Sequence, residues 1–560
     1  MTVGFSGAEL SAKTALPSKQ TMKKNSPPRI IPASAWSATF VMAELYGCGR
    51  APQRRSNASL SGSSASFFSV EQASQALHRK SIFNIVERME KNPSPKPVRS
   101  IASTFVPRRS HLVGRCLFVC AAAAGLWLAT PSRGDDWPQW LGPQRDGVWR
   151  ETGILEKFPT NGPTVRWRTT IGAGYSGPAV ALGRVYITDR QLASKGSNPK
   201  DPFQRGLIQG TERVLCLNGA DGQILWKQEY DCPYNVSYPS GPRTTPVVHE
   251  GKVYTLGTEG HLFCYDANSG KNLWSHEFKK DFGIDAPVWG FAGHPLLDGQ
   301  KLICLAGGSG SIVVAFDKDT GKELWRSLSA KEPGYAPPMI YEAGGQRQLI
   351  VWHPESINSL DPETGKLYWT KPYPARSGLS LSTPRKMNDL LFITSFYNGP
   401  IMLRLDSEKP DATILWRGKG TNERNTDGLH SIISTPFLED GHIYGVCSYG
   451  QLRCLKADTG ERLWETFAAT TGDKEARWAN AFLVKNGNRF FLANEKGDLI
   501  IAKLTPKGYE EISRAHVIEP TNTAAGRDVV WSHPAFANRC AYVRNDREII
   551  CVSLAGPSDR

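Results

Sequence analysis

A short phrase that ends in Trp recurs between residues 218 and 464, and it restricts the possible folds more than any other feature. Its six copies share an acidic or Asn residue, a turn and an aliphatic or aromatic residue before the Trp. They read NGADGQILW, DANSGKNLW, DKDTGKELW, DPETGKLYW, DSEKPDATILW and KADTGERLW, and end at Trp226, Trp274, Trp325, Trp369, Trp416 and Trp464. Successive Trp residues lie 44 to 51 residues apart. A repeat of this length built from short strands is typical of a β-propeller.

The sequence that precedes each Trp indicates strands rather than helices. Before Trp274 the chain reads TPVVHEGKVYTLGTEGHLFCYDANSGKNLW, in which three strand-length apolar segments are separated by Gly-containing turns. The Asp can cap the amides of the following turn, and the Gly permits a left-handed backbone. We therefore expect the Trp on the outer, fourth strand of a blade, docked against a neighbouring blade.

The number of strand sets predicts eight blades. They begin at Gly177-Pro178, Thr245-Pro246, His294-Pro295, Pro337-Pro338, Thr383-Pro384, Thr435-Pro436, Asn480-Ala481 and His533-Pro534. The seventh set has Ile512 where Trp is expected, and the eighth has no fourth strand. The segment TVRWRTTI, with Trp167, precedes the first set and can supply that strand. We predict an all-β, eight-bladed propeller of four-stranded antiparallel blades, closed by an N-terminal strand.

Charge divides the chain into a basic leader and a nearly neutral body. The formal net charge is +14, of which +13 falls on residues 1–134. We expect residues 1–107 to be a disordered basic, Ser-rich leader, with a mis-assigned start as the alternative. Residues 108–134 have the basic start and 14-residue apolar run of a signal peptide, with an uncleaved anchor as the alternative. We expect a Trp-rich irregular strap at 135–163 and the propeller at 164–555; the strap packs on the ring or lines a binding surface.

The repeat resembles the docking phrase of the PQQ-like (pyrrolo-quinoline quinone repeat) β-propeller family, approximately Ala-x-Asp-x-x-Thr-Gly-x-x-x-Trp. The copies ending at Trp325 and Trp464 match it well, and the resemblance covers residues 165–555. One branch of this family consists of quinoprotein alcohol and sugar dehydrogenases, which bind PQQ and calcium. Another consists of non-catalytic propellers similar to BamB, a scaffold of outer-membrane assembly. The phrase is common to both branches, so it indicates the fold and leaves the function open.

The residues that the resemblance would require for dehydrogenase chemistry are not evident. The chain has no adjacent cysteine pair and no Cys-x-x-Cys-His haem motif, and no calcium-ligand set can be aligned. We therefore expect no catalytic residues, no metal and no cofactor; PQQ and calcium belong to the alternative, a quinoprotein dehydrogenase. The segment GAGYSG, residues 172–177, fits a dinucleotide-binding pattern, but a strand pattern follows it instead of a helix.

The cysteines are expected to be structural. Cys216, Cys264, Cys454 and Cys551 occupy the same place in four blades, where a bridge between blades would be too long, so we expect buried thiols. Cys540 and Cys551 flank a predicted hairpin. A disulfide between them remains an alternative.

Loops that lead into the first strand of each blade provide the candidate ligand site, because they converge on the mouth of the central channel. The residues singled out are Tyr175, Arg243, Trp289, His294, Tyr335, His430, Arg477, Trp478, Asn480, Trp531 and His533. Aromatic rings with Arg, His and Asn suit a planar or sugar-like ligand, or a peptide strand. The alternative is that these side chains only fill the channel.

Together these features predict an exported, non-catalytic binding or scaffolding module of the periplasm or cell envelope. Its expected partners are envelope proteins or a small planar or sugar-like ligand, and we expect a monomer. Basic residues do not cluster in the body, so nucleic acid is not expected. Membrane contact is expected only through the N-terminal segment if it stays uncleaved, which would anchor the protein in the inner membrane.

Overall fold

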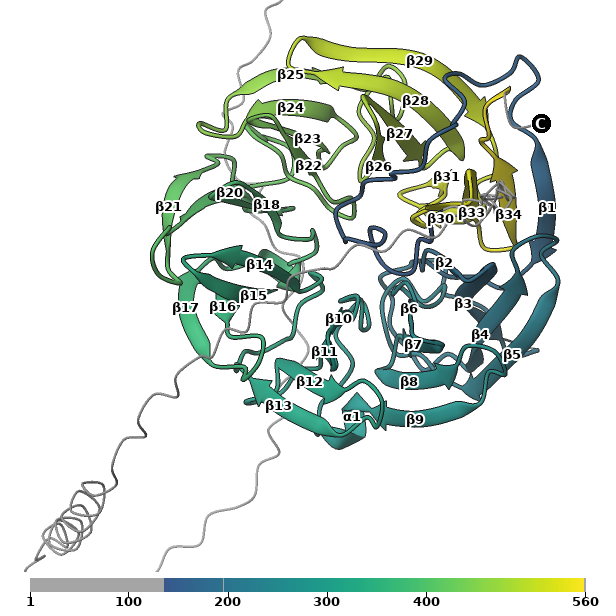
Figure 1. The fold of residues 1–560 in the computed structure, drawn as a ribbon, viewed down its shortest axis with the longest axis horizontal. Helices are drawn as coiled ribbons and strands as arrows, with labels where there is room; N and C mark the ends of the chain where they lie inside the picture. The colour runs from purple at the N-terminus through teal and green to yellow at the C-terminus, as the bar shows by residue number, and fades with distance from the viewer. Residues whose placement is uncertain (1–134, 195, 558–560) are drawn as a thin grey trace, which may run out of the picture. The chain divides into compact units, whose positions relative to one another are not determined.

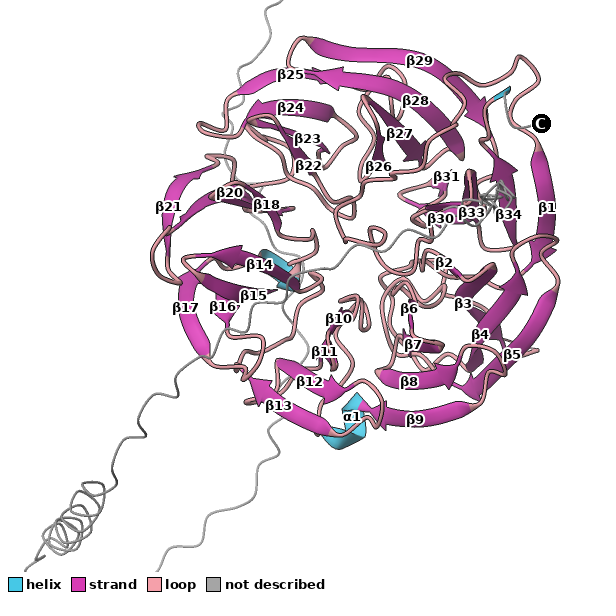
Figure 2. Cartoon of the chain, viewed as in Figure 1, coloured by secondary structure: helices cyan, strands magenta, loops and turns pink. Residues whose placement is uncertain are grey.

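A computed structural model describes residues 135–194 and 196–557, and these form a ring of eight four-stranded antiparallel sheets (Figure 1). The predicted leader and signal peptide lie outside the described residues. Among the described residues, helix is limited to α1 (Phe278–Asp281), the 3-10 turn η2 (Arg376–Gly378) and a short cyan segment near the C-terminus (Figure 2). The predicted eight-bladed propeller is confirmed. No helix among the described residues has the length and apolar character needed to cross a bilayer.

The first four blades each use four consecutive strands, running from the channel outward. Blade 1 consists of β2 (Ala179–Ala181), β3 (Arg184–Leu192), β4 (Gly210–Asn218) and β5 (Ile224–Asp231). Blade 2 consists of β6 (Val247–His249), β7 (Lys252–Leu256), β8 (His261–Asp266) and β9 (Asn272–Glu277). Blade 3 consists of β10 (Leu296–Asp298), β11 (Lys301–Leu305), β12 (Val313–Asp317) and β13 (Glu323–Ser327). Blade 4 consists of β14 (Met339–Ala343), β15 (Gln346–His353), β16 (Ser356–Leu360) and β17 (Leu367–Pro372).

Blades 5 to 7 repeat this order, and blade 8 takes its outer strand from the other end of the propeller. Blade 5 consists of β18 (Arg385–Met387), β19 (Leu390–Ser395), β20 (Gly399–Leu405) and β21 (Ala412–Arg417). Blade 6 consists of β22 (Phe437–Glu439), β23 (His442–Val446), β24 (Leu452–Lys456) and β25 (Arg462–Thr466). Blade 7 consists of β26 (Ala481–Asn486), β27 (Arg489–Asn494), β28 (Asp498–Thr505) and β29 (Gly508–His516), followed by the hairpin β30 (Asn522–Ala524) and β31 (Arg527–Val529). Blade 8 consists of β32 (Ala535–Ala537), β33 (Cys540–Arg544), β34 (Glu548–Ser553) and β1 (Val165–Thr170).

Closure of the ring follows the predicted route. Strand β1 pairs antiparallel with β34, where Trp167 lies opposite Cys551. The Trp167 indole N–H then donates to the carbonyl of Gly219 in blade 1, at 3.0 Å. The same type of contact, an indole N–H donating to a carbonyl of the next blade, joins blades 1 and 2, 2 and 3, 5 and 6, and 6 and 7.

The repeated Trp and Gly form one unit across five of the eight blade boundaries. Trp226, for example, donates its indole N–H to Ala267 of blade 2, and a Cβ on Gly270 would lie 2.7 Å from the Trp226 ring. Gly270 also has a φ of +71°. The Gly therefore serves two needs, a left-handed turn and space for the ring of the preceding blade.

Trp369 departs from this pattern. Its indole N–H donates to Gln348 Oε1 in its own blade, at 2.9 Å. The next blade carries the irregular phrase DSEKPDATILW, which has no Gly in the turn. The remaining docking residues, Trp274, Trp325, Trp416 and Trp464, all lie on outer strands.

A β-bulge precedes the Trp position in every blade and corrects one residue of the predicted alignment. In blade 6 the register shifts between Cys454 and Leu455, so that Leu463 is bulged and Trp464 lies opposite Cys454. In blade 7 the equivalent shift leaves Ile512 bulged and places Ser513 at the Trp position. The strap residue Phe158 is buried here and donates its backbone N–H to Ser513 Oγ at 3.0 Å.

Irregular residues 135–163 form a strap across the face of the ring on which the first and second strands of each blade are joined. Pro138 accepts a hydrogen bond from Val248 of blade 2, and Trp149 donates its backbone N–H to Lys485 of blade 7. Both Trp149 and Trp137 are only 1% exposed. Figure 1 shows this segment, in dark blue, crossing from the edge near β1 to the centre.

Arg145 of the strap closes the channel at that face. Its guanidinium donates to the carbonyls of Pro295 (2.9 Å) and Pro338 (3.3 Å) in blades 3 and 4. Its own carbonyl accepts a hydrogen bond from Arg385 of blade 5. Burial of this cation lowers the pKa of Arg145 to about 10.

All eight cysteines of the described residues are buried free thiols. Cys540 lies opposite Ser553, and Cys551 lies opposite Tyr542, so the two cysteines are diagonal neighbours on β33 and β34. The structure therefore contains no disulfide between them, in contrast to the alternative raised by the hairpin sequence.

Candidate functional site

A cavity of about 450 Å³ lies at the channel end opposite the strap, within the range of roughly 300–1,000 Å³ that is usual for small-molecule sites. The connections from the fourth strand of one blade to the first strand of the next meet at this face. Because neighbouring strands are antiparallel, the connections from second to third strands lie at the same face. Both kinds of connection line the cavity, and eleven of its 23 lining residues are Phe, Tyr or Trp.

Most of the residues singled out from the sequence meet in this cavity. The nine that line it are Tyr175, Arg243, Trp289, His294, Tyr335, Arg477, Trp478, Trp531 and His533. His430 and Asn480 do not line it. Asn480 is 1% exposed, and its side-chain nitrogen and oxygen have no hydrogen-bond partner among the described residues.

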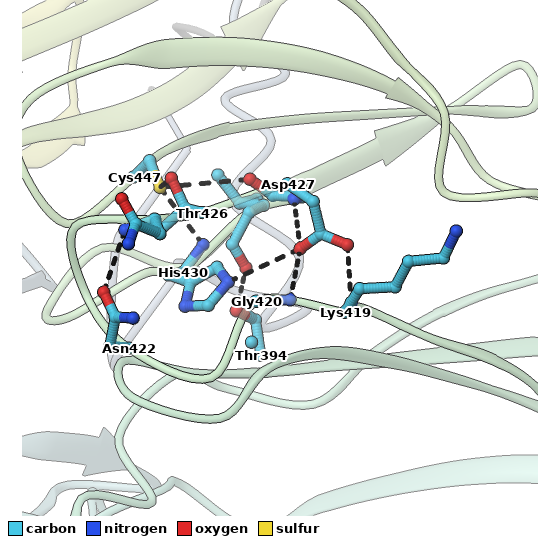
Figure 3. Close-up of polar contacts among 12 residues, drawn as sticks. Thr394, Lys419, Gly420, Asn422, Thr426, Asp427, His430 and Cys447 are labelled. Atoms are coloured by element: carbon cyan, nitrogen blue, oxygen red, sulfur yellow. Dashed lines mark hydrogen bonds and ion pairs between the residues drawn. The ribbon is translucent and has the colours of Figure 1, made fainter.

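His430 belongs to a polar cluster formed largely by the loop between β21 and β22 (Figure 3). Its Nδ1–H donates to the carbonyl of Phe396 at 3.1 Å, and its Nε2 lies 3.8 Å from Asp427 Oδ1. Its backbone N–H contacts Cys447 Sγ at 3.3 Å. Burial lowers the pKa of His430, which is fully enclosed. The side chain therefore holds its loop in place.

Arg243 builds the cavity wall and has no N–H group left for a ligand. Its Nε donates to Trp289 O at 2.9 Å, and its two terminal nitrogens donate to the carbonyls of Gly241, Ser237 and Tyr238 and to Thr258 Oγ1. These contacts use all five donors of a guanidinium. Its charge lies over the Tyr175 ring, 5.3 Å from the centroid.

The floor of the cavity consists of one strap residue and two neutral histidines. The Trp140 indole stacks on His294, with 4.0 Å between centroids and 10° between planes, and lies 4.7 Å from the His533 ring. Trp140 Nε1–H donates to Thr383 Oγ1 at 3.0 Å. Trp140 was not among the predicted site residues, although lining of a binding surface by the strap had been one alternative.

Both floor histidines are uncharged at neutral pH. Burial, followed by the charge of Arg145, holds the pKa of His294 well below its usual range. Burial also lowers the pKa of His533 to about 3. Thr245 donates its backbone N–H to His294 Nδ1 at 2.9 Å, so the ring proton of His294 is on Nε2.

Three cavity residues have left-handed backbone conformations that bulky side chains rarely adopt. The φ angles are +54° for Tyr238, +58° for Ser377 and +64° for Trp478. Such strain costs of order 1–3 kcal/mol per residue and clusters at binding sites. The fold therefore holds Tyr238 and Trp478 in place at the cavity against a local cost.

Sequence reasoning missed several lining residues, some of them because it considered only the loops that lead into the first strand of each blade. Phe203 and the pair Phe396–Tyr397 come from connections between second and third strands, and Tyr238 lies five residues before Arg243. The available signal for Phe203 was the unusual length of its connection, residues 193–209, compared with two to seven residues in the other blades.

The cavity residues do not fit the calcium-quinone centre of the dehydrogenase branch. Calcium takes about six to eight oxygen ligands, with carboxylates prominent. The cavity is lined by no Asp, Glu, Asn or Gln. Across the described residues, no group of three or more His, Cys, Asp or Glu is arranged to hold a metal ion. The aromatic walls suit a flat ring, but the donor set does not suit the metal.

Comparison with known proteins places the repeat in one family. A family model described as outer membrane protein assembly factor BamB matches residues 210–402 and 309–558, more than half of the chain. The protein is also 25% identical over 207 residues to a quinoprotein ethanol dehydrogenase of Pseudomonas putida, covering 33% of this chain and 32% of that protein.

Individual relatives carry the same description. The assembly factor BamB of Burkholderia pseudomallei is 26% identical over 136 residues, covering 23% of this chain and 31% of that protein. The matched regions span about a third of the length of these curated relatives. The crystal structure of BamB from Moraxella catarrhalis superposes with a TM-score of 0.44 and 16% identity, covering 69% of this chain and 97% of that chain.

Proposed function

Since this chain belongs to the family described as outer membrane protein assembly factor BamB, we propose that it is a non-catalytic binding and scaffolding module of the cell envelope. The observation that supports this proposal is the aromatic cavity, which offers extensive apolar contact and no carboxylate. A planar ligand or an apolar group of an envelope protein would find complementary surfaces there.

The ionisation states of the cavity residues also favour binding over catalysis. A general base at neutral pH needs a pKa near the working pH. His533, with a pKa of about 3, is a poor proton acceptor. Burial raises the pKa of Tyr175, Tyr238 and Tyr335, so these phenols stay protonated. Neither a base nor an activated nucleophile results.

Reconstitution tests the proposal against a quinoprotein dehydrogenase, the function of several relatives. The purified protein would be incubated with PQQ and calcium chloride, and then assayed with an artificial electron-accepting dye and ethanol or glucose. We expect dye reduction equal to that of the same mixture without protein. Saturable oxidation of either substrate would overturn the non-catalytic proposal.

Fractionation of the native cell tests the proposed location. We expect the protein in the periplasmic or envelope fraction, with an N-terminal sequence that starts close to residue 135. Recovery of the full-length chain from the cytoplasm would contradict export. In that fraction, cross-linking should join the protein to an envelope protein. A chain that forms no cross-link to any other protein would count against the scaffolding role.

A further inference from the structure

We propose that the long connection in blade 1 is the specificity element of the cavity, with Phe203 as an aromatic cap that admits flat, hydroxyl-poor ring compounds, uncharged or anionic. This inference rests on the proposed binding function and names its ligand class. The connection spans residues 193–209, whereas the seven equivalent connections have two to seven residues. The additional length lies at the face where the cavity opens.

Phe203 reaches the cavity mouth and touches residues from two different loops between blades. Its ring packs edge-on against Tyr238, 5.2 Å away, in the loop between blades 1 and 2. It packs in the same manner against Trp478, 5.7 Å away, in the loop before blade 7. Blade 1 is thereby connected to blade 7 across the mouth.

The connection is fixed at the cavity and is not a free loop at this point. Tyr238 donates its backbone N–H to Pro202 O at 2.6 Å, and Ser237 Oγ donates to Phe203 O at 3.1 Å. Yet the Phe203 side chain is 47% exposed. A large apolar ring held at a cavity mouth and half-open to solvent gains burial when a flat apolar ligand lies beneath it.

The polar groups of the lining restrict the ligand further. Buried Tyr238 Oη, Tyr335 Oη, Trp478 Nε1 and His533 Nε2 have no hydrogen-bond partner among the described residues. These few atoms could serve one or two polar groups on a ring edge. They are too few for the hydroxyl groups of a sugar, which would be desolvated without compensation.

The charges of the lining disfavour a cation. No carboxylate lines the cavity, whereas Arg477 is exposed at its edge, with its guanidinium 4.2 Å from the Trp478 ring centroid. Arg477 makes no ion pair among the described residues. A ligand with an acidic group at the mouth would supply the missing counter-charge, and an ammonium group would be repelled.

Titration calorimetry with three defined probes tests the ligand class. The probes are 2-naphthoate, (2-naphthylmethyl)ammonium and maltose. We expect 2-naphthoate to bind one-to-one, the ammonium probe to bind at least tenfold more weakly, and maltose to give no heat of binding. Maltose or the ammonium probe binding as tightly as 2-naphthoate would overturn the ligand class.

Four variants separate the cap from the cavity itself. Phe203→Ala should raise the Kd for 2-naphthoate about tenfold, as expected for the loss of aromatic packing. Phe203→Tyr should restore it, and Leu207→Ala, on the same connection but outside the cavity lining, should leave it unchanged. Trp289→Ala removes a cavity wall and should also weaken binding.

The outcomes distinguish the two proposals. If Trp289→Ala weakens binding and Phe203→Ala does not, the cavity remains the site and the cap is refuted. If 2-naphthoate does not bind, or binds equally well to Trp289→Ala, the cavity is not the site and both proposals fail. Phe203 is half-exposed, so unfolding midpoints of its variants should match the wild type and exclude misfolding as the cause.

Discussion

Trp140 and His294 stack almost parallel, 4.0 Å apart, although one belongs to an irregular strap and the other opens blade 3. The contact joins a segment outside the repeat to the inside of the ring. It closes one end of the channel and leaves the other open, so the channel becomes a cavity with a single mouth. The strap residue in the floor of this cavity lies outside the repeated sequence.

Removing the floor residue should destabilise the protein strongly. Trp140→Ala loses the stack on His294 and the hydrogen bond to Thr383, and leaves a void in a buried position. We expect a loss of about 3–5 kcal/mol in the free energy of unfolding, measured by urea denaturation. Trp140→Phe keeps an aromatic ring and should cost less. A midpoint for Trp140→Ala equal to the wild type would refute the role of this residue.

Two glycine variants can separate the two roles of the turn glycines, the left-handed backbone and the space for the Trp ring. Gly222 has a φ of +75°, and a Cβ there would lie 2.5 Å from the Trp167 ring. Gly251 has a φ of +74° with nothing within 4 Å of the added Cβ. Gly251→Ala should cost about 1–2 kcal/mol through its backbone alone. Gly222→Ala should cost about 1–3 kcal/mol more, because it also displaces the Trp. Equal losses in urea denaturation would show that the Trp contact contributes nothing.

The buried histidines should make stability depend on pH below neutrality. The pKa of His533 is about 3 in the folded protein and about 6.5 when unfolded, so the unfolded state binds the extra proton between these values. Stability is therefore present above pH 6.5 and is lost as the pH falls towards 3. Between pH 7 and pH 5, wild type should lose about 2 kcal/mol more than His533→Asn.

The control for this pH effect is His249→Gln, which replaces a histidine whose side chain is 42% exposed. Its unfolding free energy, followed by urea denaturation at pH 7, 6 and 5, should change in parallel with the wild type. Parallel behaviour of His533→Asn as well would mean that His533 titrates normally in the fold.

Arg243 should stabilise the fold through its hydrogen bonds and not through its charge. Arg243→Lys keeps the charge but has three donors for the oxygens that the guanidinium now contacts. We expect a loss of about 1–3 kcal/mol in the free energy of unfolding, measured by thermal or urea denaturation. Arg477→Lys, at an exposed position, should change it by less than about 0.5 kcal/mol. A larger loss of stability for Arg477→Lys than for Arg243→Lys would contradict this structural role and leave Arg243 as a candidate ligand-binding residue.

The sequence predicted the ring well, because each repeat specifies both a turn and the strand after it. Its one misplacement, Ile512 for Ser513, arose because a bulge changes the register by one residue without changing the spacing along the chain. The site was less predictable. The position of a residue in a loop does not determine where its side chain points. His430 therefore lies outside the cavity lining, whereas Tyr238 is part of it.

Two of the lining residues that sequence reasoning missed lie in segments that the repeat does not specify. Trp140 comes from the strap and Phe203 from the long connection in blade 1. Both side chains are placed at the cavity by contacts with residues far away in the sequence, which a local pattern does not reveal. The repeated local sequence thus predicted the propeller fold. It did not predict which side chains line the cavity.

Pairing of β1 with β34 has a consequence for how the chain is made. Val165 lies opposite Val552, so almost the whole propeller must be synthesised before its first strand meets its partner. Until then, β1 lacks a partner and the other seven blades form an open arc. Shortened chains that stop before β34 should remain open, with unpaired strand edges available to proteases and to aggregation. Pairing of β1 with β34 thus checks that the whole propeller has been synthesised.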